Sequence, residues 1–441
     1  MCEELYTAQC TTLGTFSLAT SCVNHQQLLA GCGYIQIRFA LAALAATGAF
    51  AQSTVTIYGA IDAAYTNYAT EGVSVSGLGN SQLGSSKLGF SGTEDLGNGL
   101  KANFKLEGGL ANDSGNGKAS NTNNQVSGRG LVPNTSLGAT TGLASGNPTA
   151  LSAGGTQGLV FQRYAYVGLS GGFGEVRLGR DYTGTFLGVI AATDPFGTNG
   201  PADSSAMTLN LAAIAKQQTS ASASNMIGYT TPSFGGVSAN LQTFFGENTS
   251  VVYVNGANQV ASNPNDGDGY SATVSYAAGP VFVAAGQSQT KGTVQAATPA
   301  MAATNGDYTQ RALAASYDMG VAKLAYTYTR EELIKSATAT ATNSSNLIGV
   351  TVPVGAFNYK ASYVRSVQNT GVAAALDNTG TLVGVGVDYA LSKRTTAYTT
   401  YSRITNDNVA AAGTAVYGAA LSQAAVNPTS TGLAIGIKHN F

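Results

Sequence analysis

Sixteen segments of this chain alternate apolar and polar residues with the two-residue period of a β-strand. In residues 99–110, one face would carry Leu100, Ala102, Phe104 and Leu106, and the other Lys101, Asn103, Lys105 and Glu107. Neither sustained helical periodicity nor a run of eighteen apolar residues occurs, so helical membrane spans are not supported. The predicted strands are residues 54–65, 82–93, 99–110, 159–171, 173–181, 223–231, 236–246, 268–279, 280–291, 308–319, 320–331, 345–352, 355–367, 380–391, 394–405 and 431–441.

The connections between these strands alternate between short turns and long polar segments. The short turns, such as Gly279-Pro280, are rich in the residues that hairpins require. The long segments are 66–81, 111–158, 182–222, 247–267, 292–307, 332–344, 368–379 and 406–430. Long loops at one end and tight turns at the other are typical of an outer-membrane barrel, whereas a soluble sandwich has no reason to keep this alternation. The sequence therefore predicts an all-β fold, a 16-stranded antiparallel transmembrane β-barrel.

Charge and composition agree with that fold. Only 10% of the residues are charged, against about 25% in an ordinary soluble domain. The net charge of −1 excludes a nucleic-acid binder whose affinity rests on positive charge. Sixteen strands make a barrel wide enough for an aqueous lumen, which the polar faces would line.

The N-terminal region predicts an exported protein. Arg38 precedes an apolar segment that ends in Ala49-Phe50-Ala51, a pattern that signal peptidase cleaves. We expect an atypical extension over 1–37, a signal peptide core and cleavage region over 38–51, and a barrel domain over 52–441. The alternatives are a membrane anchor and a lipoprotein signal at 29–32. The four cysteines, Cys2, Cys10, Cys22 and Cys32, all precede the predicted barrel.

Two short motifs mimic functional sites. Residues 168–172 match the G-x-S-x-G pattern around Ser170, but they fall in a predicted hairpin instead of a strand-turn-helix. Residues 265–269 hint at a calcium loop that lacks its distant glutamate. We therefore expect no catalysis, no cofactor and no metal site.

The chain resembles the general diffusion porins of β-proteobacteria, of the Burkholderia, Bordetella and Neisseria type. The resemblance rests on "AQSTVTIYGAIDAAY" (51–65), "SSKLGFSGTEDLGNGLKANFKLE" (85–107), "FQRYAYVGLSGGFGEVRLGRDY" (161–182), "VGVDYALSKRTTAYTTYSRI" (385–404) and "GIKHNF" (436–441). It implies a homotrimer in the Gram-negative outer membrane, in contact with lipid and lipopolysaccharide, whose third long loop folds into the lumen. It also implies insertion by the barrel-assembly machinery, with the aromatic Phe441 as the signal.

The resemblance directs attention to the third long loop, residues 182–222. Its Asp194-Pro195-Phe196-Gly197 resembles a divergent form of the Pro-Glu-Phe-Gly of porin constriction loops. We expect Asp194 and Asp203 to form the negative side of a constriction, because opposed charges across a narrow pore sort ions. The facing basic wall would comprise Lys87, Lys101, Lys105 and Arg177, with Glu107 and Glu175 as its few acidic residues. Arg163 and Arg180 are interpreted as rim residues.

The predicted function is passive diffusion of ions and small hydrophilic solutes through a water-filled pore, with a weak anion preference. The last strand would face lipid through its apolar parity and close the barrel by pairing with the first strand around Val55 and Ile57. Two rivals remain open: a barrel used as an adhesin or receptor, with recognition in loops 111–158 and 406–430, and a secreted soluble β-protein.

Overall fold

The computed structural model describes residues 54–118, 124, 161–215, 217–246, 250–254, 257–263, 265–294, 305–371, 377–408 and 427–441. The predicted signal region and extension lie outside these ranges, as does most of loop 111–158 and of loop 406–430. None of the helices in the described ranges is both long enough and apolar enough to cross a bilayer.

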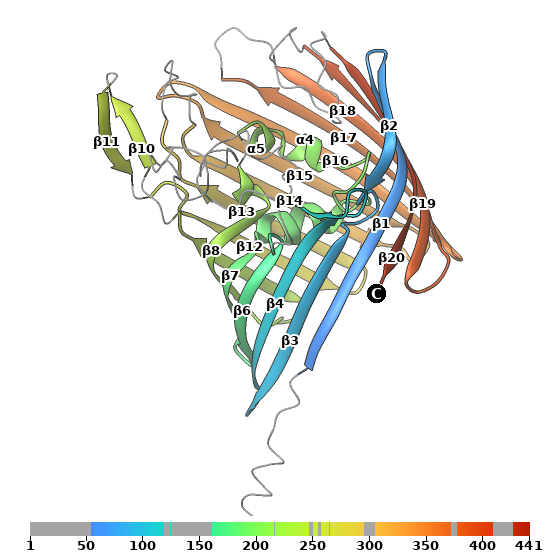
Figure 1. Ribbon diagram of the computed structural model, residues 1–441, viewed down its shortest axis with the longest axis horizontal. Coiled ribbons are helices and arrows are strands. Elements are labelled where there is room, and N and C mark those ends of the chain that lie inside the picture. Colours follow the sequence, from blue (N-terminus) through green and yellow to red (C-terminus); the bar gives the residue numbers. More distant parts are fainter. Residues whose placement is uncertain are drawn as a thin grey trace, which may run out of the picture. The chain divides into compact units, whose positions relative to one another are not determined.

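The described residues form a closed antiparallel β-barrel (Figure 1). Its strands are β1 (Thr54–Thr70), β2 (Val73–Asn80), β3 (Lys87–Gly97), β4 (Leu100–Ala111), β6 (Tyr164–Gly171), β7 (Gly174–Tyr182), β8 (Ser222–Thr230), β9 (Val237–Phe244), β12 (Gly269–Ala278), β13 (Val281–Thr290), β14 (Tyr308–Asp318), β15 (Lys323–Ile334), β16 (Thr340–Val354), β17 (Phe357–Asn369), β18 (Asn378–Ala390), β19 (Thr395–Asp407) and β20 (Thr429–Asn440). Because β2 and β3 occupy successive parts of one wall position, the barrel has sixteen strands, as predicted. A short β5 (Asn116–Gly117) pairs with β4, and β10 (Ser250–Val254) pairs with β11 (Ala257–Asn263) outside the barrel sheet.

The first long connection is a correction to the prediction. Residues 66–81 are mostly strand: β1 continues to Thr70, turns at Glu71 and Gly72, and returns as β2. The predicted strand 82–93 instead begins at Lys87. Residues 81–86 leave the wall between β2 and β3, and we call them the inner segment. The alternation of long and short connections is therefore broken at the first hairpin.

The barrel closes between β1 and β20. The pairing runs from Ala60 opposite Asn440 to Thr70 opposite Ser430, whose hydroxyl oxygens lie 2.8 Å apart. The amide of Phe441 donates to the carbonyl of Gly59 over 3.0 Å, which extends the ladder by one pair. The prediction that the last strand pairs with the first is confirmed, but its predicted position around Val55 and Ile57 was wrong, because the paired residues of β1 begin at Ala60.

The two faces of the wall sort as the alternation predicted. On β20, Ala434 is fully buried whereas its neighbour Ile435 is 52% exposed, and on β16 Leu347 is buried whereas Ile348 is 59% exposed. The outward apolar side chains are placed for lipid. Inward positions carry the polar and charged residues described below.

The third long loop folds into the barrel, as expected. Between β7 and β8 the chain forms a short π-helix (Phe186–Ile190), α3 (Ala191–Thr193), α4 (Ser205–Thr208), α5 (Asn210–Ala215) and a 3-10 turn (Gln218–Ser220). We call residues 183–221 the constriction loop. Val189 and Ile190 pack against inward residues of β13 and β14, and Met207 packs against Leu347 and its neighbours on the facing wall. The carboxylate of Glu331 on β15 fixes α5 by accepting the amides of Leu211 at 3.0 Å and Ala212 at 2.9 Å.

Candidate functional site

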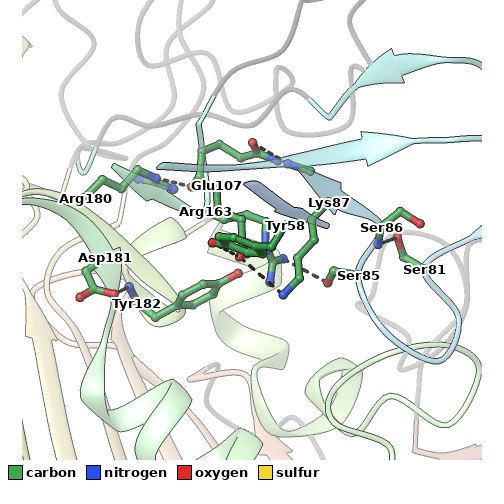
Figure 2. A network of polar contacts seen from close by, with 12 residues as sticks. Tyr58, Ser81, Ser85, Ser86, Lys87, Glu107, Arg163, Arg180, Asp181 and Tyr182 are labelled. Atoms are coloured by element: carbon green, nitrogen blue, oxygen red, sulfur yellow. Dashed lines mark hydrogen bonds and ion pairs between the residues drawn. The ribbon is translucent and has the colours of Figure 1, made fainter. Parts of the chain in front are cut away.

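Glu107 is the centre of a charged network on the inner wall (Figure 2). Its carboxylate is 1% exposed and accepts Nε of Arg163 at 2.6 Å. On its other oxygen it accepts the hydroxyl of Tyr58 at 2.9 Å, with Nζ of Lys87 at 3.5 Å. Three strands, β1, β3 and β4, and the residue preceding β6 therefore meet at one buried carboxylate. Since a buried charge requires partners, this network fixes the two cations in place.

Lys105 joins this network through aromatic rings instead of a carboxylate. Its Nζ lies 3.7 Å from the ring centroid of Tyr164 and 5.8 Å from that of Tyr58. No ion pair joins Lys105 to a carboxylate within the described ranges. A cation held by ring faces keeps its charge without direct neutralisation, so it remains able to attract an anion.

Arg177 on β7 organises a second group beside the first. It donates to Glu175 over 2.7 Å and to Asp181 over 2.9 Å, and its guanidinium lies 4.6 Å from the ring centroid of Tyr166. Glu175 also accepts Asn103 on β4 at 2.9 Å, which connects the two groups across neighbouring strands. The rings of Tyr58 and Tyr166 point inward, toward Lys105 and Arg177 respectively.

Lys87, Lys105, Arg163 and Arg177 form what we call the basic cluster. Four cations face three carboxylates there, so the wall is net positive. Lys438 on β20 is a further inward cation within electrostatic reach of Lys87, and the carboxylate of Asp62 on β1 lies within reach of it as well. A concave wall of one sign focuses its field on the neighbouring water and raises the local concentration of counter-ions.

The interpretation of Arg163 and Arg180 as rim residues was wrong. Arg163 donates to Glu107 and, over 3.1 Å, to the hydroxyl of Ser85 in the inner segment. Arg180 is 6% exposed and donates to the hydroxyls of Ser222 and Ser224 on β8. The register shifts between Gly179 and Asp181, and this bulge changes which side chains face inward. Simple counting from Arg177 therefore misplaces Arg180.

Lys101 lies apart from the basic cluster. It shares the inward parity of Lys105 but is four residues nearer the tight turn, is exposed, and pairs in register with Asp95 and Ser170. Of the four predicted wall residues, the fold brings together Lys87, Lys105 and Arg177, and it adds Arg163.

The two predicted acidic residues lie in the constriction loop. Asp194 is buried and accepts the amides of Phe196 at 2.8 Å and Thr198 at 3.2 Å, and the hydroxyl of Ser204 at 2.6 Å. Burial raises its pKa, against these hydrogen bonds. Asp203 is partly buried, accepts the amide of Ser205 at 2.7 Å, and has a pKa that burial raises to about 6.

The inner segment forms a second inward projection. Asp62 on β1 is fully buried, accepts the amides of Leu83 at 2.7 Å and Gly84 at 2.8 Å, and also accepts the hydroxyl of Tyr398 on β19. At the far side the segment meets the constriction loop at Gly200, where φ is +71° and a Cβ would lie 2.2 Å from the carbonyl oxygen of Gln82. The two projections are therefore in direct backbone contact.

The chain is similar to known proteins along most of its length. Residues 39–409 match the sequence family described as Gram-negative porin. Outer membrane porin protein 32 of Delftia acidovorans is 30% identical over 406 residues, which cover 91% of this chain and 98% of that protein.

Solved structures agree in fold. An anion-selective porin from Comamonas acidovorans is 28% identical with a TM-score of 0.66, over 88% of this chain and 100% of that one. The trimer form of OmpT from Vibrio cholerae is 15% identical with a TM-score of 0.57, over 88% of this chain and 99% of that one. The latter likeness concerns the fold alone.

Proposed function

This chain belongs to the Gram-negative porins of the outer membrane, and from that premise we propose that its basic cluster makes it a weakly anion-selective pore. Its barrel passes ions and small hydrophilic solutes by passive diffusion. Family membership favours this channel over an adhesin or receptor barrel, and it gives no support to catalysis.

The observation that carries the proposal is the balance of charge on one inner wall. Lys105 is held by rings, and one carboxylate, Glu107, serves both Lys87 and Arg163. Anions crossing the lumen beside this wall meet excess positive charge at short range, where screening by salt is weakest. The anion-selective porin of Comamonas acidovorans is a relative in which the same preference is recorded by name.

The constriction loop would supply the opposite side of the field. Asp203 is the stronger candidate, because it is partly exposed, whereas the oxygens of Asp194 are occupied by the loop's own donors. We therefore propose that Asp194 mainly stabilises the conformation of the constriction loop, and that Asp203 contributes negative charge to the pore. Lys101 contributes at the tight-turn entrance and Lys87, Lys105 and Arg177 at the constriction.

Planar bilayer recording tests the proposal. Reversal potentials in a potassium chloride gradient should show anion preference in the wild-type protein and a reduced preference in Arg163→Gln. Cation preference in the wild type, or silent insertion, would overturn the proposal.

The remaining partners follow from the family and are part of the same proposal. We propose a homotrimer, which stepwise conductance in triplets would support. We further propose that the chain is exported with cleavage of a signal peptide within residues 38–51, which leaves residues 52–441 as the mature barrel. We also propose that the barrel contacts lipopolysaccharide and that the barrel-assembly machinery recognises Phe441. Mass spectrometry of the mature N-terminus would test the cleavage.

A further inference from the structure

The outer wall carries a pair of arginines in an unusual setting. Arg311 on β14 and Arg330 on β15 lie directly opposite each other in register, on the outward face that otherwise carries Leu313 and Tyr328. Their side chains are 46% and 40% exposed. Like charges directly opposite on a sheet are destabilising unless an anion lies between them.

Glu332 supplies only part of that compensation. It accepts Nη1 of Arg311 at 3.0 Å and Nε of Arg330 at 2.9 Å, so one carboxylate serves two guanidinium groups. Nε of Arg311 donates to Gln287 over 3.0 Å, and its Nη2 donates to none of the described side chains. One positive charge and at least one strong donor therefore remain available to an external anion.

An apolar groove begins directly below the arginines. It has a volume of about 550 Å³ and walls formed by Leu241, Val274 and Leu313. Its floor consists of small residues on neighbouring strands, among them Ala239 and Ala285. A second hollow of about 390 Å³ shares Val274, Ala285 and Leu313 and continues past Val283 to Tyr326. Val283 to Gln287 alone spans about 13 Å at about 3.3 Å per strand residue. The groove is thus an elongated slot with a cationic head.

The position along the barrel indicates which side of the membrane the head faces. Arg311 and Arg330 lie near the ends of β14 and β15 that lead into the longer connections, 291–307 and 335–339. The opposite ends of β14 and β15 join each other through the short turn 319–322, and at the same end of the barrel β12 joins β13 through Gly279-Pro280. In outer-membrane barrels the short turns are periplasmic, so the arginines lie on the outer-leaflet side.

We propose that this groove binds a phosphate-bearing lipid of the outer leaflet, with one acyl chain in the slot and the phosphate on Arg311 and Arg330. The guanidinium pair offers planar donors that match phosphate oxygens, and the small residues leave room for a hydrocarbon chain. The inference rests on the outer-membrane location in the proposed function, and it adds a defined site to the general contact with lipopolysaccharide.

Native mass spectrometry of the full protein in detergent tests the site, with bisphosphorylated lipid A and its dephosphorylated counterpart as probes. We expect the wild type to prefer the phosphorylated probe and Arg311→Gln/Arg330→Gln to bind it about tenfold more weakly, since charge-assisted hydrogen bonds are lost. The matched control is Arg365→Gln/Arg403→Gln, which removes two exposed outward arginines from β17 and β19. Equal binding by the two double variants, or equal binding of the two probes by the wild type, would overturn the proposal.

A second pair of variants tests the slot. Ala285→Leu should weaken the binding of both probes, whereas Ala361→Leu, an outward alanine on β17, should not. If Ala285→Leu instead changes the oligomeric state and leaves lipid binding intact, the occupant is a second copy of the chain and the lipid site is wrong. Unchanged conductance in bilayers confirms that each variant is folded. If the wild type shows no anion preference, the proposal about pore selectivity is refuted, but the proposed lipid site is not affected.

Discussion

Arg163 donates from Nε to the buried carboxylate of Glu107 over 2.6 Å, across a sequence separation of 56 residues. The same carboxylate lies 3.5 Å from Lys87. Glu107 therefore holds the two cations in place and also reduces the field that they present to the lumen.

Replacing Glu107 should separate these two roles. Glu107→Gln retains an acceptor for Arg163 but removes one negative charge, so anion preference should rise several-fold by reversal potential, because charges at such distances interact strongly in a partly desolvated site. Glu94→Gln removes the same charge near the tight turn and serves as the control. A fall in anion preference in Glu107→Gln would show that the cations lose their positions without the carboxylate.

Lys105 and Lys101 offer a comparison on a single strand. Lys105→Gln should reduce anion preference markedly, since its Nζ belongs to the basic cluster. Lys101→Gln should have a much smaller effect, because it lies about 13 Å away along the strand, beyond a Debye length of about 8 Å at physiological salt. Equal effects in a salt-gradient recording would mean that the entrance, and not the cluster, determines selectivity.

Asp203 predicts a pH dependence with a defined sign. Burial raises its pKa to about 6, so the carboxyl is charged at pH 7 and neutral at pH 5. The anion preference of the wild type should therefore increase as the pH falls through 6. Asp203→Asn, which is neutral at this position at both pH values, should show at pH 7 and at pH 5 the anion preference that the wild type reaches at pH 5. Because the pKa is higher in the folded state than in the unfolded state, the contribution of this carboxyl to the stability of the fold is greatest below about pH 4. That contribution is lost as the pH rises through about 6. A wild-type pH profile identical to that of Asp203→Asn would contradict the assignment.

Replacing Asp62, which anchors the inner segment, should change the size of the pore. Asp62→Ala removes the acceptor of two backbone amides in the inner segment and of the Tyr398 hydroxyl. We expect lower thermal stability, by about 3 kcal/mol as for other lost buried hydrogen-bond networks, together with altered and more variable single-channel conductance. Asp388→Ala, which removes the partner of Lys360 at 2.5 Å elsewhere on the inner wall, is the comparison. Steady, wild-type conductance in Asp62→Ala would show that the inner segment does not limit the pore.

Phe441 predicts separate effects on assembly and packing. A Cβ at Gly59 would lie 2.3 Å from Cζ of Phe441, so Gly59→Ala should disturb this contact and cost about 1–3 kcal/mol through overpacking. Deleting Phe441 removes both the contact and the proposed assembly signal, and should reduce the yield of assembled protein in cells far more than Gly59→Ala does. In refolding from urea, where no assembly machinery acts, the two variants should differ little. Normal cellular yield without Phe441 would exclude the signal role.

Strand periodicity was sufficient to predict the barrel and the inward side of Lys87, Lys105 and Arg177. It failed where the chain departs from a regular strand. The predicted strands 82–93 and 159–171 included residues that precede β3 and β6, namely most of the inner segment "SQLGSS" and Arg163. Counting along a regular strand therefore gave the wrong direction for these side chains. The strand β2 could have been found, because Val73 and Val75 alternate with Ser74 and Ser76 after the turn signal Glu71-Gly72. Bulges and buried anchors such as Asp62 depend on contacts between distant segments that no local pattern contains.

The seam between β1 and β20 has a consequence for the order of folding events. Thr70 and Ser430 meet although 360 residues separate them, and β1 pairs with β2, β3 and β20 along its length. Hairpins between successive strands form locally, but ring closure is a contact of very long range and so is kinetically late. The first strand must therefore wait, with one edge unpaired, until the last strand has been exported, and during that interval its competing fate is pairing with another unfolded chain.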